Sequence, residues 1–89
     1  LGVKRIVIFG IGELAEFAYL SIQESSLILV GFVADGQGDH FLSFPCGTLD
    51  TLKNWNFDAI LISDLGNVEV ARTRIQDSGI PEKQIFSIM

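Results

Sequence analysis

Apolar residues fall into short unbroken runs that alternate with segments in which they recur at helical spacing. Ile6–Phe9 and Leu27–Val33 are apolar at nearly every position, which is typical of parallel strands covered on both faces. Between these runs, Leu14, Ala18 and Ile22 recur at the spacing of one helix face. The pattern therefore predicts a strand, a helix and a second strand in the first third of the chain.

The middle of the chain predicts shorter elements. His40–Gly47 is expected to form a short strand at the sheet edge, where Pro45 is tolerated because it lacks an N–H. Thr48 is a candidate cap for a short helix that runs to Trp55. Phe57–Ser63 then has the composition of another strand.

The C-terminal third predicts one helix and one strand. After Asn67, apolar positions again recur at helical spacing. Gly79 is expected at the C′ position of this helix, and Pro81 prevents its continuation. Gln84–Ile88 is the last predicted strand.

This order of elements predicts a small doubly wound α/β domain of Rossmann type, with a parallel sheet and helices on both faces. Right-handed crossovers favour the strand order 3-2-1-4-5. The first and fourth strands are then neighbours whose crossovers leave to opposite sides, which opens a crevice at their carboxyl ends. Residues 1–89 are expected to form one domain, and the start at Leu1 without an initiating Met indicates a domain excised from a longer chain.

The turn after the first strand carries the pattern Gly-x-Gly-x-x-Ala. Gly10 is expected to make the sharp turn, Gly12 to let a phosphate approach the backbone, and Ala15 to allow close packing of helix on strand. The unpaired N–H groups at the start of the helix add an anion site. A phosphate-bearing ligand is the first hypothesis, and a purely structural tight turn is the alternative.

Acidic and hydroxyl residues follow the other strands that border this crevice. Asp35 comes about 20 residues after the glycines and either accepts hydrogen bonds from a ribose or stabilises its own Asp-Gly turn. Ser63 and Asp64 are candidates to contact a ribose or base edge, and the alternative is that Asp64 and Asn67 simply cap the next helix. The candidate ligand-binding residues are Gly10, Ile11, Gly12, Glu13, Leu14, Ala15, Asp35, Ser63 and Asp64.

Charge and composition exclude several classes of function. The net charge of −5, with only six scattered Lys and Arg, argues against direct nucleic-acid contact. No apolar run is long enough to span a membrane, and there is no signal peptide, so we expect a cytoplasmic protein. Cys46 is the one cysteine and His40 the one histidine, which leaves no cluster of metal ligands. No arrangement of nucleophile, base and oxyanion donors is visible, so we expect no catalysis by this domain alone.

The chain is unusually apolar for its size. Hydrophobic residues make up 48% of it and seven are Phe, more than a small core readily hides. Phe41, Phe44 and Trp55 are therefore expected to form an apolar, aromatic edge through which two copies associate.

Four segments carry a family resemblance: Lys4–Ala15, Val30–Asp35, Phe57–Ile62 and Gly79–Ile85. Together they resemble the CoA-binding-like Rossmann domain that follows the winged helix-turn-helix region of certain bacterial transcription regulators. They are also similar to the nucleotide-sugar-binding N-terminal domain of sialic-acid-type acetyltransferases and to the NAD-binding portion of sugar-nucleotide epimerases and dehydratases.

The first resemblance implies a ligand-sensing, dimerising regulatory domain, with NAD(H), CoA or a nucleotide sugar as the candidate ligand. The other resemblances imply a nucleotide-sugar or NAD-binding domain of a polysaccharide-biosynthesis enzyme. A third possibility is a degenerate fold that serves only for association.

Overall fold

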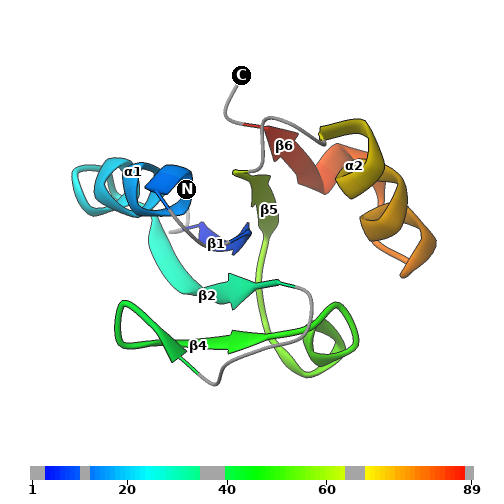
Figure 1. Ribbon diagram of the computed structural model, residues 1–89, viewed down its shortest axis with the longest axis horizontal. Coiled ribbons are helices and arrows are strands. Elements are labelled where there is room, and N and C mark those ends of the chain that lie inside the picture. The colour runs from blue at the N-terminus through cyan, green and yellow to red at the C-terminus, as the bar shows by residue number, and fades with distance from the viewer. Residues whose placement is uncertain (1–3, 11–12, 35–39, 64–67, 88–89) are drawn as a thin grey trace.

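The computed structural model describes residues 4–10, 13–34, 40–63 and 68–87. Figure 1 shows the arrangement of the helices and strands. In chain order the elements are β1 (Arg5–Phe9), α1 (Glu13–Gln23), β2 (Ile28–Val33), β3 (His40–Phe41), β4 (Phe44–Gly47), the 3-10 helix η1 (Thr51–Asn54), β5 (Ala59–Ile62), α2 (Val68–Asp77), the 3-10 helix η3 (Glu82–Gln84) and β6 (Ile85–Ser87).

The strands form one sheet in the order β3-β4-β2-β1-β5-β6. The pairs β4–β2, β2–β1, β1–β5 and β5–β6 are all parallel. Numbered along the chain without β3, these five strands have the order 3-2-1-4-5, so the predicted doubly wound topology is confirmed.

The edge strand β3 is the main departure from the predicted sheet. It pairs antiparallel with β4, with His40 opposite Pro45, so the strand that contains Pro45 is not the outermost one. The hairpin turns through Leu42 and Ser43, whose φ angles are 52° and 71°. Neither residue is a usual choice for this left-handed conformation, which explains why the sequence indicated one short strand over His40–Gly47 and not a hairpin.

The two faces of the sheet are covered by different helices (Figure 1). On one face, Ala15, Ala18 and Ile22 of α1 are buried in a cluster with side chains of β1, β2 and β5. On the other face, Ala71 and Ile75 of α2 belong to a second cluster, which η1 also joins. The central strands β1, β2 and β5 each contribute to both clusters, because successive side chains of a strand point to opposite faces.

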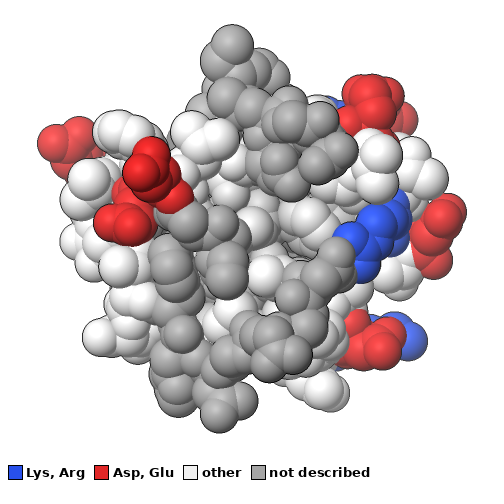
Figure 2. Space-filling model, viewed as in Figure 1, with Lys and Arg blue, Asp and Glu red and all other residues white. Residues whose placement is uncertain are grey.

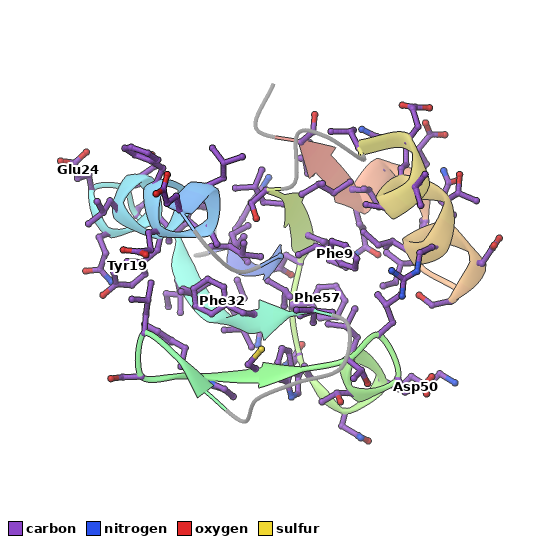
Figure 3. All side chains as sticks on the ribbon, in the orientation of Figure 1. Phe9, Tyr19, Glu24, Phe32, Asp50 and Phe57 are labelled. Atoms are coloured by element: carbon purple, nitrogen blue, oxygen red, sulfur yellow. The ribbon has the colours of Figure 1, made fainter. Side chains whose placement is uncertain are left out.

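The aromatic side chains follow this division. Phe32 belongs to the α1-side cluster and Phe9 to the α2-side cluster, and Figure 3 shows them on opposite sides of the sheet. Both are buried, with exposed fractions of 0% and 7%. The unbroken apolar runs of the sequence are thus explained by burial on both faces of the central strands.

α2 ends as the sequence predicts. Gly79 has a φ of 104° and follows the last helical turn, as predicted for a C′ glycine. Ser78 adds to the cap, because its N–H donates to the Arg74 carbonyl at 3.2 Å and its hydroxyl to the Ile75 carbonyl at 2.7 Å.

The short helix in the middle of the chain is smaller than predicted. η1 covers only Thr51–Asn54 and has no side-chain cap. Thr48 does not cap it in the expected way: its backbone N–H donates to the Thr51 hydroxyl at 3.2 Å. The tight packing of the preceding segment accounts for this, since a Cβ added at Gly47 would lie 2.8 Å from the Thr51 side chain.

Gly31, in β2, is required by packing between distant parts of the chain. A Cβ there would lie 2.7 Å from the Pro45 carbonyl oxygen and 3.0 Å from the Trp55 ring. A glycine inside a strand often marks the close approach of another segment. The structure shows that β4 and Trp55 occupy the space.

Candidate functional site

The carboxyl ends of β1 and β5 form the candidate site. These strands are parallel neighbours, with Phe9 opposite Ile62 at their ends. After β1 the chain crosses one face of the sheet through α1, and after β5 it crosses the other face through α2. In open α/β sheets, ligands bind in the crevice at such a point of reversal.

At the end of β1, the chain makes the predicted sharp turn. Gly10 has a φ of 120°, a conformation that side chains rarely adopt. Its N–H donates to the Val33 carbonyl at 2.7 Å, which ties the start of the turn to the end of β2. Ala15 is fully buried against the sheet, as expected of the small residue that allows α1 to pack closely on β1.

At the end of β5, Ser63 is almost fully buried, with 3% of its surface exposed. Its backbone N–H and its hydroxyl both donate to the Phe9 carbonyl, each at 3.0 Å. The hydroxyl proton is thus engaged in joining the two strands, and toward a ligand this group can act only as an acceptor. Gly10 and Ser63 are the two predicted site residues that the structure brings to adjacent strand ends.

The first turn of α1 is acidic. Glu13 and Glu16 lie there, and both are exposed. Figure 2 shows acidic side chains gathered over α1, at the left of that view. Carboxylates stabilise a helix N-terminus, but they also repel a phosphate that approaches the same N–H groups. Leu14, the next predicted site residue, is 36% exposed.

Arg74 is the site residue that sequence reasoning missed. Its guanidinium carbon lies 5.9 Å from the centroid of the Phe9 ring, in a cation–π arrangement at the end of β1. Arg74 lies in the last turn of α2, and side chains on a helix lean toward its N-terminus, which is the direction of the carboxyl end of β5. That lean is the signal that could have identified it.

The other basic residues lie elsewhere. Arg72 donates to the Ile85 carbonyl at 3.3 Å, and Lys53 lines a hollow beside the end of α2. The remaining three lie at the amino ends of strands, at the opposite edge of the sheet: Lys4, Arg5 and Lys83. Of the six Lys and Arg, Arg74 is therefore the one placed at the end of β1.

Four predicted site residues lie outside the part of the chain that the structure describes: Ile11, Gly12, Asp35 and Asp64. Within the described ranges, no three His, Cys, Asp or Glu residues come together as a metal site. Cys46 is a half-buried free thiol that packs against the α1-side cluster. Neither α1 nor α2, the α-helices of these same ranges, is long and apolar enough to cross a membrane.

The fold and the crevice between β1 and β5 define a small doubly wound α/β domain. The chain belongs to the family described as "C2185-like, N-terminal", whose model matches residues 2–86. No curated protein matches the sequence.

Proposed function

We propose that this domain binds a small phosphate-bearing ligand of the nucleotide class in the crevice between the ends of β1 and β5. The observation that carries the proposal is that the crossovers after the parallel neighbours β1 and β5 leave to opposite faces of the sheet, combined with the positive φ of Gly10 at the turn that leads to α1. NAD(H), CoA and nucleotide sugars are the candidate ligands.

Charges around the crevice support a ligand with few phosphates. The N-terminus of α1 attracts an anion, and the Arg74 guanidinium lies beside the Phe9 ring on the α2 side. Glu13 and Glu16 oppose this attraction. We therefore expect AMP or a dinucleotide to bind more tightly than ATP, whose additional phosphate charges would face the two carboxylates.

The proposed role is regulatory binding rather than catalysis. The hydroxyl of Ser63, at the end of β5, donates its proton to the Phe9 carbonyl, whereas an activated nucleophile needs an adjacent base. A bound ligand would act on the rest of a larger protein, such as a bacterial transcription regulator, through its different affinity for two arrangements of the domains.

The test is thermal unfolding of the domain with NAD+, NADH, acetyl-CoA, UDP-sugars, AMP and ATP in turn. A ligand at about 100 times its Kd adds roughly 2.7 kcal/mol to the free energy of unfolding, which is a readily measured rise in Tm. Arg74→Gln should weaken binding of the active compound, and Arg72→Gln, a change of the same kind on the same helix, should leave it unchanged. If none of the compounds raises the Tm, the proposal fails.

A further inference from the structure

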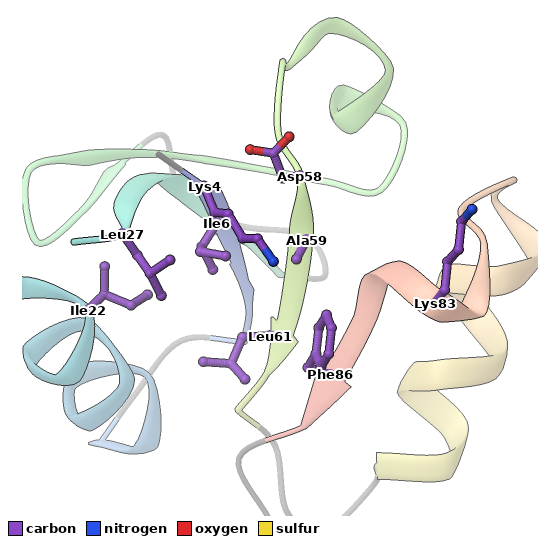
Figure 4. A pocket seen from close by; sticks show the side chains of 9 residues that line it. All are labelled: Lys4, Ile6, Ile22, Leu27, Asp58, Ala59, Leu61, Lys83 and Phe86. Atoms are coloured by element: carbon purple, nitrogen blue, oxygen red, sulfur yellow. The ribbon is translucent and has the colours of Figure 1, made fainter. Parts of the chain in front are cut away.

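A groove of about 420 Å³ runs along the sheet between α1 and β6. Figure 4 shows Leu61 on its floor, Ile22 and Leu27 on the α1 side, and Phe86 on the β6 side. Charged residues lie at the end of the groove where the strands begin: Lys4, Asp58 and Lys83. The groove thus has an apolar floor and a charged rim at its amino end.

The groove exists because β5 and β6 are covered by α2 on one face of the sheet, whereas α1 leaves part of their other face open. α2 buries the first of these faces, where Ile60 and Ile85 are 0% and 4% exposed. On the α1 side, Phe86 of the same strand is 54% exposed. Parallel strands are normally covered on both faces, so an apolar surface on β5 and β6 is expected to be covered by another element.

The outer face of α1 is apolar as well. Phe17 and Leu20 are 66% and 55% exposed, on the side of the helix away from the buried Ala15, Ala18 and Ile22. Together with Glu13 and Glu16 they line a hollow of about 280 Å³. A helix that faces only water normally carries polar residues there.

The geometry points to a second copy of this chain as the element that covers both surfaces. α1 forms one wall of the groove through Ile22, so the outer face of this helix borders the open side of the groove. A two-fold axis parallel to α1 and between them places the α1 of each copy over the groove of the other. In the same contact, Phe86 of each copy faces the α1 surface of its partner.

Charge complementarity supports this pairing. The last turn of α1 has no basic residue, and the exposed Glu24 follows it, so this end of the helix is negative. Ile22 lies in that last turn and lines the same groove as Lys4 and Lys83. A two-fold axis parallel to α1 leaves the two α1 helices parallel, so their C-terminal ends lie at the same end of the dimer. Each copy's Glu24 therefore comes next to its partner's two lysines.

The other rim charge does not cancel this attraction. Asp58 accepts a hydrogen bond from the Arg5 N–H at 2.7 Å, and the Arg5 side-chain Nε lies 3.7 Å from the same oxygen. The lysines are therefore the uncompensated charges of the rim. A contact between the outer faces of the two α1 helices, in contrast, would bring Glu13 and Glu16 of both copies together, because α1 contains no Lys or Arg.

The required contact is modest in area. Specific interfaces bury about 800 Å² on each partner, a small share of the 5512 Å² that this chain exposes. The proposal does not rest on the ligand site, because the groove and its lysines lie away from the carboxyl ends of the strands. Arg74→Gln is accordingly expected to leave association unchanged.

Sedimentation velocity tests the apolar part of the contact. The unchanged chain should sediment as a dimer at micromolar concentration. Phe17→Asp and Phe86→Asp should each give monomers, whereas Val70→Asp, at a 58% exposed position on α2, should remain a dimer. Circular dichroism should be the same for all four, because the altered side chains are exposed.

Mixing the two monomeric variants is the decisive step. A heterodimer of Phe17→Asp with Phe86→Asp retains one intact contact between α1 and the groove, whereas either homodimer retains none. Dimers should therefore reappear in the mixture. A mixture that stays monomeric, or an unchanged chain that is monomeric up to millimolar concentration, would overturn the proposal and assign the groove to a different partner.

Charge reversal tests the orientation of the two copies. Glu24→Lys and Lys83→Glu should each raise the dimer Kd by about threefold to tenfold, since two exposed ion pairs are lost per dimer. The two variants mixed in equal amounts should recover the original Kd, because opposite charges again face each other. If the mixture is no tighter than the single variants, Glu24 does not face Lys83 of the partner and the proposed axis is incorrect.

Discussion

Ser63 donates two hydrogen bonds to a single acceptor, the Phe9 carbonyl, through its N–H and its hydroxyl. Both are 3.0 Å long, and Ser63 is buried. The contact joins the end of β5 to the end of β1 across 54 residues of sequence. It holds together the two strand ends between which the proposed crevice opens.

Replacing Ser63 by Ala should lower the free energy of unfolding by about 1 kcal/mol, the usual net contribution of one buried hydrogen bond. The loss stays moderate because the Phe9 carbonyl keeps the backbone N–H of residue 63. Urea denaturation measures the difference, and Ser21→Ala, an exposed position on α1, is the control. A change of 0.3 kcal/mol or less would mean that the hydroxyl bond contributes little.

Gly31→Ala should be strongly destabilising, by about 1–3 kcal/mol. The added methyl group would lie 2.7 Å from the Pro45 carbonyl oxygen and 3.0 Å from the Trp55 ring. The Pro45 carbonyl belongs to the backbone of β4, so it cannot move away without shifting that strand. Adding Trp55→Leu should recover only part of the loss, because the contact with Pro45 remains. Thermal unfolding of the single and double variants separates the two contributions, and full recovery would contradict this account.

Gly79→Ala provides a contrasting case, in which space is available but the backbone conformation is not. Nothing lies within 4 Å of a Cβ at this position, yet the φ is 104°. The expected loss is about 1 kcal/mol, from conformational strain alone. Gly79→Asn should lose less than Gly79→Ala, because Asn tolerates positive φ better. Equal losses in chemical denaturation would argue against strain as the cause.

Asp58 is expected to contribute through its hydrogen bond to the backbone rather than through its ion pair. Both side chains of the Arg5–Asp58 pair are 41% exposed, and the charged atoms are 3.7 Å apart, so the pair itself should be worth little. Asp58→Ala should lower the free energy of unfolding by about 1 kcal/mol. Arg5→Gln, which keeps the N–H, should change it by less than about 0.5 kcal/mol, and a larger effect of Arg5→Gln would show that the charge matters.

Much of the fold could be predicted because the signals for it are local. The unbroken apolar runs indicated parallel strands, and the expected order of the five parallel strands is the one observed. The hairpin between β3 and β4 could not be predicted, since Leu42 and Ser43, the two residues of its turn with positive φ, are not of the types that usually adopt that conformation.

The candidate site was only partly predictable. The glycine pattern correctly placed a sharp turn at Gly10, and burial confirms the packing expected of Ala15. The expected aromatic edge is a different case. Phe44 packs edge to face with Tyr19 and Phe32, with ring centroids 5.5 and 6.2 Å apart. Such internal contacts use an aromatic side chain that composition alone suggested for an interface.

By itself, the sequence determined the sequential order of strands and helices, the doubly wound topology, and the turns at Gly10 and Gly79. These depend on apolar periodicity and on backbone conformations that one residue type favours. Only the tertiary structure decided that Arg74 lies over Phe9, and that Phe86 of β6 lines one groove with Ile22 of α1. Such relationships arise from the packing of elements distant in sequence, and the local pattern around each residue contains no information about its eventual neighbours.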